Sequence, residues 1–181
     1  MPVVLTSKRL KLRPWRADEH DAFAALNAEP DMARYLSPFS RARSDAMLDR
    51  IVAHVAQHGW GYWAIEEKQG DAPIGSCGLM HVSFDAFFTP AVEVSWRLSA
   101  KFQGRGLARE AAQTVLGFAF QSIRLDRVVA FTATANAPSW GLMKRLGMHR
   151  IGEFDNSEFP EGHALRVNVV YEVRAADWRP S

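Results

Sequence analysis

The sequence has a single cysteine and no long apolar run. Cys77 alone cannot form a disulfide within the chain, and the chain has no Cys-x-x-Cys pair for a zinc site. The apolar stretch at residues 115–120 is too short to span a bilayer, and the N-terminal residues lack the h-region of a signal peptide. These absences predict a protein of the reducing cytoplasm that does not cross a membrane.

The chain also has little net charge and no internal repeat. Its 22 Lys and Arg residues nearly balance 20 Asp and Glu residues, which leaves a formal charge of +2. The basic residues form no run or stripe, so we expect no nucleic-acid partner. With 181 residues and no linker rich in Pro, Gly or Ser, the chain is expected to form one domain at residues 6–178.

Hydrophobic periodicity predicts a mixed α/β fold. We expect helices at residues 17–28, 44–58, 107–123 and 138–146, and strands at residues 9–15, 61–68, 73–82, 91–98, 127–133, 148–154 and 164–174. Pro30 is expected to end the first helix, and Gly147 to cap the last one.

The most informative segment is the turn between strand 91–98 and the helix that begins at Leu107. Gly104 and Gly106 lie in this turn. The first N–H groups of a helix lack internal partners and carry partial positive charge, while glycines let an anion approach the backbone. With Arg105 and Arg109 nearby, the turn is a candidate pyrophosphate site.

Other interpretations of this turn are weaker. A P-loop requires Gly-Lys-[Ser/Thr], but Leu107 follows Gly106. A dinucleotide fingerprint requires a small residue where Arg109 stands, and the turn comes late in the chain, although Asp126 has the spacing of the ribose-binding acid. A third alternative is that the glycines serve only the geometry of the turn.

Four segments resemble the GCN5-related N-acetyltransferase (GNAT) family. Residues 103–108 (QGRGLA) resemble its acetyl-CoA loop, [Arg/Gln]-x-x-Gly-x-[Gly/Ala], and residues 134–148 are similar to its Asn-x-x-[Ala/Ser] block. Residues 5–15 and 163–171 resemble the RimJ/RimL-like branch, the ribosomal-protein N-acetyltransferases. The resemblance implies a mostly antiparallel sheet of about seven strands, flanked by helices, in which a splayed strand pair holds acetyl-CoA.

The resemblance also implies an activity, which is transfer of the acetyl group from acetyl-CoA directly to a primary amine through a ternary complex. The amine would belong to a protein N-terminus or a small molecule, and the protein would be a monomer or a homodimer. A bulge near Val94 would free a backbone N–H for the oxyanion. The expected cofactor-binding residues are Trp96, Arg97, Leu98, Gln103, Gly104, Arg105, Gly106, Leu107, Ala108, Arg109, Asn136, Ser139 and Met143.

Two residues are candidates for catalysis. Glu93, on the strand expected to carry the bulge, is the candidate base for the amine; the alternative is a solvated or ion-paired strand residue. Many family members have a tyrosine at the position of Met143, so we assign the proton donor to the thiolate to Ser139, whose alternative role is a helix N-cap. The missing tyrosine leaves a second hypothesis, a non-catalytic acyl-CoA-binding module.

Several other residues have simpler interpretations. Cys77 is expected to be a small buried residue, and His54 and His58 share a helix face but lack the Glu of a His-Glu-x-x-His motif, so no metal is expected. The acceptor is expected to meet residues 32–39, the 84–90 loop and the late hairpin. The phenylalanines of this loop would form a lid, a dimer contact or a tucked-in connection; they are Phe84, Phe87 and Phe88. The acids of the hairpin would attract a cationic amine or simply face solvent; they are Glu153, Asp155, Glu158 and Glu161.

Overall fold

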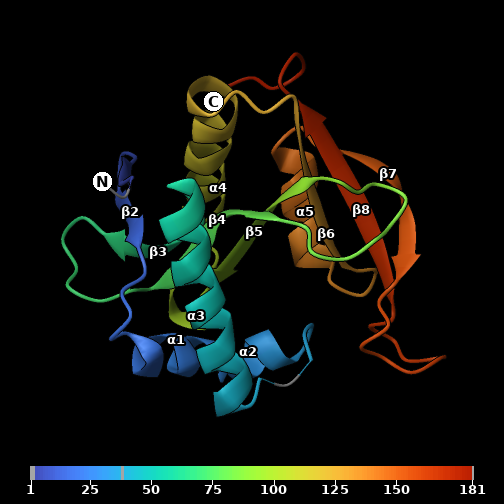
Figure 1. Cartoon of the computed structure of the whole chain (residues 1–181), viewed down its shortest axis with the longest axis horizontal. Helices are drawn as coiled ribbons and strands as arrows, with labels where there is room; N and C mark the ends of the chain where they lie inside the picture. Colours follow the sequence, from blue (N-terminus) through green and yellow to red (C-terminus); the bar gives the residue numbers. More distant parts are fainter. Residues whose placement is uncertain (1–2, 38, 181) are drawn as a thin grey trace.

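The computed structural model describes residues 3–37 and 39–180, and its centre is one mixed sheet with the strand order β1-β2-β3-β4-β5-β6-β8-β7 (Figure 1). The strands are β1 (Leu5–Thr6), β2 (Leu10–Pro14), β3 (Tyr62–Glu67), β4 (Gly75–His81), β5 (Val92–Leu98), β6 (Arg127–Ala133), β7 (His149–Asp155) and β8 (Val167–Arg174). Neighbouring strands are antiparallel except β5 and β6, which are parallel.

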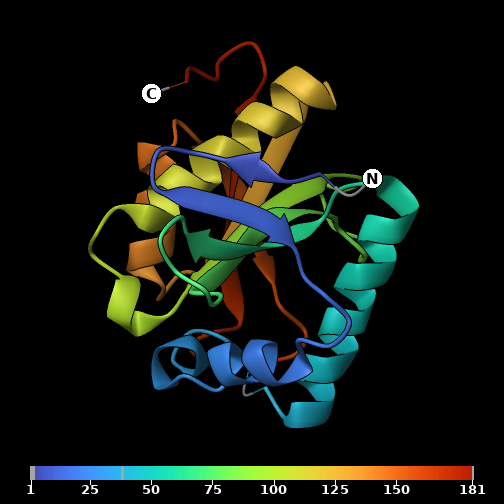
Figure 2. The same cartoon turned by 90° about the vertical axis from the view of Figure 1, so that its left-hand side faces the viewer.

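Helices cover both faces of the sheet. One face carries α1 (His20–Asn27) and α3 (Arg41–His58), and the other carries α4 (Leu107–Gly117) and α5 (Ala137–Arg145) (Figure 2). Short segments complete the set: α2 (Pro30–Ala33), the 3-10 turn η1 (Ala100–Phe102) and the π-helical turn η2 (Phe118–Ser122). Within residues 3–37 and 39–180 there is no helix whose length and apolar character would let it cross a bilayer.

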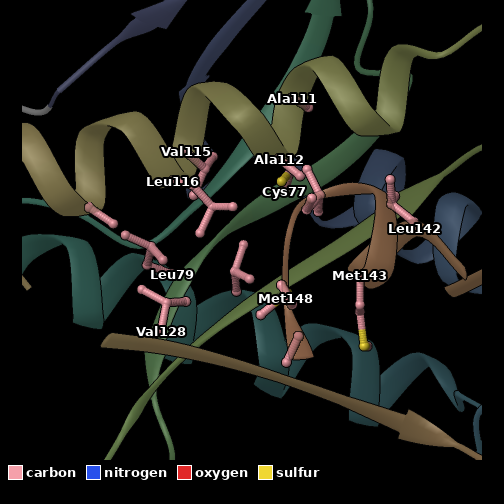
Figure 3. Close-up of a cluster of buried hydrophobic side chains, with 14 of the residues drawn as sticks. Cys77, Leu79, Ala111, Ala112, Val115, Leu116, Val128, Leu142, Met143 and Met148 are labelled. Atoms are coloured by element: carbon pink, nitrogen blue, oxygen red, sulfur yellow. The ribbon is translucent and has the colours of Figure 1, made fainter. Parts of the chain in front are cut away.

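The alternation of side chains along the strands produces two main apolar cores, and a third, small cluster contains Phe88, Val129 and Val170. The larger core joins the sheet to α4 and α5 and contains Cys77, Val115 and Met143, all at most 1% exposed (Figure 3). The smaller core lies between the sheet and the α1–α3 pair and contains Phe23 and Leu48. Cys77 is therefore a small buried residue, as expected, and burial raises the pKa of its thiol.

The sheet matches the expected mixed, mostly antiparallel arrangement, with corrections at some boundaries. It has eight strands because the two-residue β1, which is too short to show periodicity, pairs with β2. Pro30 does not end the first helix; α1 ends at Asn27, and Pro30 opens α2, where its missing N–H leaves no partner unsatisfied. The predicted helix 107–123 is α4 followed by the π-helical turn.

The expected splay between β5 and β6 is present, but its expected cause is wrong. The two strands pair only at Glu93 and Val129, so they diverge along the rest of their length. All seven residues of β5 pair with β4 in an unbroken register, so β5 contains no extra residue and no bulge near Val94. The register shift lies instead in β7, between Arg150 and Gly152.

Candidate active site

The turn at residues 103–106 has the geometry of an anion site. Gly104 and Gly106 have φ angles of 72° and 76°, in the left-handed region that disfavours side chains. Gly106 is the N-cap of α4. In the described part of the chain, no backbone N–H of residues 104–109 donates a hydrogen bond. A run of free N–H groups at the N-terminus of a helix can bind a phosphate.

Contacts with the N-terminal strands hold this turn in place. The Arg9 guanidinium donates to the Arg105 carbonyl oxygen at 3.0 Å, and Glu110 accepts from the Arg9 side chain and the Ser7 hydroxyl, each at 2.7 Å. Burial disfavours the Glu110 carboxylate, but these hydrogen bonds outweigh it and lower its pKa. The turn is thus shaped by protein contacts before any ligand binds.

The charged and polar side chains of the turn have different surroundings. Arg105 forms an ion pair with Glu67 at 2.6 Å. The Gln103 side chain donates to the Leu98 carbonyl oxygen at 3.0 Å, which braces the end of β5. Arg109 is exposed and has no ion-pair partner among residues 3–37 and 39–180, so its guanidinium is free to reach an anion on the turn.

The backbone of β5 faces the gap beside β6. Ala91 and Ser99, which flank the strand, hydrogen-bond to the β4 side, so the odd-numbered residues of β5 bond to β4. The backbone N–H and C=O groups of the even-numbered residues therefore point toward β6. Trp96 and Leu98 lie beyond the single Glu93–Val129 pair, where β6 has diverged, so their groups line the gap.

Arg97 has its side chain on the opposite face from the turn. Its guanidinium donates to the Asn27 side-chain oxygen at 2.5 Å and lies 4.7 Å from the centre of the Phe39 ring. Burial lowers its pKa, although the charge of Glu93 opposes this. Only the backbone of Arg97 could therefore contact a ligand in the gap between β5 and β6.

The start of α5 places Asn136 and Ser139 close together. Asn136 is the N-cap, which accepts from the Ser139 backbone N–H at 3.4 Å and donates to the Thr132 hydroxyl at 2.9 Å. The capping alternative for the Ser139 hydroxyl is thus excluded, and this hydroxyl makes no hydrogen bond to any described residue. Met143 is 1% exposed and packs in the larger core, as Figure 3 shows.

Glu93 lies where β5 and β6 begin to diverge. Its carboxylate accepts a hydrogen bond of 2.5 Å from the Tyr62 hydroxyl. Burial raises the pKa of Glu93, and the Tyr62 hydrogen bond and the charges of Arg97 and Arg50 offset this only in part. Burial and the charge of Glu93 raise the pKa of Tyr62 in turn, so the phenol stays protonated and donates.

Glu93 forms part of the wall of a cavity of about 1000 Å³ on the α3 side of the sheet. The lining combines histidine, phenylalanine and charged side chains from α3, the β4–β5 loop, β6 and the end of β7: His54, His58, His81, Phe84, Phe131, Phe154, Arg50, Asp85, Glu93, Asp155 and Glu158. Among the described residues, Glu93 is the β5 residue that lines the cavity, and it lies three residues before Trp96 on the strand.

The expected acceptor segments contribute unequally to this cavity. The β4–β5 loop and the hairpin after β7 line it, whereas no described residue of the 32–39 segment does, and Pro38 of that segment lies outside the described residues. Figure 1 shows the β4–β5 loop reaching across to β7 and β8. Its Phe84 ring lies 5.6 Å from Phe154 and 5.7 Å from Phe131, and Phe88 is buried, whereas Phe84 and Phe87 keep exposed faces.

The acidic hairpin residues are mostly paired. Glu153 pairs with Arg150, Asp155 with Arg166, and Glu158 with Arg43, at 2.5, 3.0 and 2.8 Å. Of these acids, only Asp155 and Glu158 line the cavity. The hairpin therefore presents less free negative charge to the cavity than the sequence suggests.

Sequence reasoning missed Tyr62 and His81. Tyr62 was hidden among apolar strand residues, and its role depends on the pairing of β3 through β4 to β5. His81 ends β4 beside His54, with its Nδ1 3.1 Å from His54 Nε2. No sequence spacing signals this contact, because it joins a helix to a strand.

Solved acetyltransferase structures share this architecture. A GNAT-family acetyltransferase from Bacillus anthracis superposes with a TM-score of 0.77 at 20% identity, covering 96% of this chain and 99% of that one. A ribosomal-protein-S5-alanine acetyltransferase from Vibrio fischeri gives 0.76 at 19% identity, covering 98% of this chain and 100% of that one. The fold is that of the GNAT acetyltransferases.

Sequence comparison leads to the same family. The family model described as acetyltransferase (GNAT) domain matches residues 9–149. The protein named "Uncharacterized N-acetyltransferase YnaD" of Bacillus subtilis (strain 168) is 25% identical over 177 residues, which cover 96% of this chain and 98% of that protein. The chain belongs to the GNAT acetyltransferase family, and its likeness to a ribosomal-protein acetyltransferase is consistent with the RimJ/RimL-like branch.

Proposed function

We propose that the protein transfers the acetyl group of acetyl-CoA directly to a primary amine within a ternary complex. The family uses acetyl-CoA as co-substrate. The observation that carries the proposal is the position of Glu93, whose carboxylate lines the cavity at the point where β5 and β6 separate. An amine in the cavity would there meet a thioester held in the gap.

In this proposal the cofactor binds through backbone groups. The free N–H groups of residues 104–109 take the diphosphate, aided by the positive end of α4 and by Arg109. Pantetheine then lies beside β5 and hydrogen-bonds to the Trp96 carbonyl oxygen and the Leu98 N–H, and Asn136 lies near its amide portion. Arg105 contributes through its backbone, because its guanidinium is paired with Glu67.

Glu93 is the proposed general base. The attacking amine must be neutral, and an α-amino group with a pKa of about 8 loses its proton more readily than lysine at about 10.4. The raised pKa of Glu93 makes its carboxylate a stronger base near neutral pH. The amine nitrogen then attacks the thioester carbon, and the Trp96 N–H, in place of an N–H at a bulge near Val94, donates to the resulting oxyanion.

Ser139 is the proposed donor to the departing thiolate. The Asn136 side chain caps α5, which leaves the Ser139 hydroxyl without a partner among the described residues. Collapse of the tetrahedral intermediate breaks the C–S bond, and the sulfur takes a proton or hydrogen bond from this hydroxyl. Met143, which stands at the position of the usual tyrosine, has a thioether that cannot donate a proton.

A screen of amine acceptors tests the proposed reaction. With acetyl-CoA, we expect free thiol release and one acetylated product for at least one acceptor class, measured by a thiol reagent and mass spectrometry. At neutral pH, peptides with a free α-amine should react faster than the same peptides with only lysine amines. The alternative, a non-catalytic acyl-CoA-binding module, is favoured by Met143 and predicts coenzyme binding without product from any acceptor.

Removing the Tyr62 hydroxyl should change the pH dependence of the reaction. The hydrogen bond from Tyr62 lowers the pKa of Glu93, so Tyr62→Phe should raise that pKa further. The base is active when deprotonated, so the acidic limb of the kcat/KM profile should move to higher pH while acetyl-CoA affinity stays unchanged. Tyr35→Phe, away from Glu93, is the control; an identical profile for both variants would contradict the role of Tyr62.

A further inference from the structure

Three histidines from two elements meet at the wall of the cavity. His54 and His58 are four residues apart on α3 and so share a face of this helix, and His81 ends β4 opposite them. One ring nitrogen from each histidine can be chosen so that all three lie within 4.8 Å of one another. The His54 Nε2–His81 Nδ1 distance is 3.1 Å.

A backbone carbonyl fixes the orientation of the central histidine. The Nδ1 of His54 lies 2.9 Å from the Trp60 carbonyl oxygen, which can only accept, so Nδ1 carries the proton. In the neutral ring the Nε2 lone pair then points toward His81. Such an outer carbonyl partner is the usual support of a metal-binding histidine. The Trp60 ring also packs against all three imidazoles, with centroid distances of 4.8 to 5.7 Å.

The spacing of the nitrogens suits a tetrahedral metal ion. With metal–nitrogen bonds of about 2.0–2.1 Å, two ligands of such an ion lie about 3.3 Å apart. The distance of 3.1 Å between His54 Nε2 and His81 Nδ1 is already close to this value. Small rotations of the exposed His81 side chain would bring the other nitrogen–nitrogen distances, now at most 4.8 Å, closer to it. His81 Nδ1 needs only a change of tautomer, with its proton moving to Nε2, to offer a lone pair.

We propose that His54, His58 and His81 bind a divalent transition-metal ion such as Zn²⁺, with the fourth coordination position open to the cavity. Three imidazoles plus one open position are a ligand set that zinc accepts. Two charged side chains in the cavity lining would act on the cation: the negative charge of Asp85 would attract it, and the positive charge of Arg50 would repel it. The His54–His58 spacing alone did not predict a metal; the third ligand comes from β4. The proposal is independent of acetyl transfer.

Metal binding by the tag-free full-length chain tests this proposal. At pH 7.5 without acetyl-CoA, titration calorimetry with Zn²⁺ should give one site per chain, and Co²⁺ should develop the visible absorption of a tetrahedral site. His58→Gln and His81→Gln should each weaken Zn²⁺ binding about 100-fold or more. Either variant serves if the other fails to fold, which circular dichroism would reveal.

His149→Gln is the matched control, because His149 is an exposed histidine of β7 outside the cluster. It should bind Zn²⁺ with wild-type affinity. No stoichiometric binding by the wild type, or equal affinities in the His58, His81 and His149 variants, would overturn the proposal. Neither outcome bears on acetyl transfer, which the amine screen measures separately.

Discussion

Replacing Glu93 by glutamine should lower kcat by about 10²- to 10⁴-fold, the range that a positioned general base contributes. Glutamine keeps the size of the side chain and can still bond to the Tyr62 hydroxyl, but it cannot take a proton from the amine. The acetyl-CoA sites proposed on the turn and along β5 do not involve the Glu93 side chain. Cofactor affinity, measured by calorimetry, should therefore stay within about two-fold of wild type.

The pH profile separates catalysis from a structural effect. In the wild type, kcat/KM should fall as the pH drops through the raised pKa of Glu93, because protonation removes the base. That limb should vanish in Glu93→Gln. Asp71→Asn, an acid exposed in the β3–β4 turn, is the control and should keep wild-type rates and limb. Retention of both the rate and the limb in Glu93→Gln would refute the base role.

Gly106→Val should abolish binding of acetyl-CoA. A ligand at 100 times its Kd stabilises the native state by about 2.7 kcal/mol, which is about 5–10 °C in Tm for a chain of this size. Valine at φ 76° is strained, and its branched side chain would stand beside the free N–H groups of the turn. We therefore expect the wild type to show this Tm shift on adding acetyl-CoA and the variant to show none.

Gly147→Val provides a control with the same backbone strain. Gly147 follows α5 at φ 80°, and a Cβ there would meet nothing within 4 Å. Both variants should lose roughly 1–2 kcal/mol of stability from the left-handed backbone, since each replaces a glycine in the αL region. Only the Gly106 variant should lose the shift on adding acetyl-CoA. Equal Tm shifts on adding acetyl-CoA in both variants would contradict a diphosphate site on the turn.

The parts of the fold that depend on local patterns were predictable. Alternating apolar residues marked the strands, and the paired glycines 104 and 106 marked the turn whose N–H groups are free. The splay of β5 and β6 came from the family resemblance. A structural feature was predictable from the sequence where it depends on residues that are neighbours in the chain.

The parts that depend on pairing between distant segments were not predictable. The bulge near Val94 was expected from the family resemblance and was wrong, because β5 stays in register with β4 along its whole length. Tyr62 and His81 acquire their neighbours only through the order of strands in the sheet. The helix boundary at Pro30 was wrong because proline fits the first turn of a helix as well as it ends one.

The single Glu93–Val129 pair between β5 and β6 gives a bound molecule a mechanical role. The strands up to β5 and those from β6 onward share almost no ladder hydrogen bonds, so the seam between them depends on side-chain packing. An extended ligand with amide groups would supply the missing inter-strand hydrogen bonds and join the two halves of the sheet as an added strand would. The coenzyme would then stabilise the contact between the two halves of the sheet as well as donate the acetyl group.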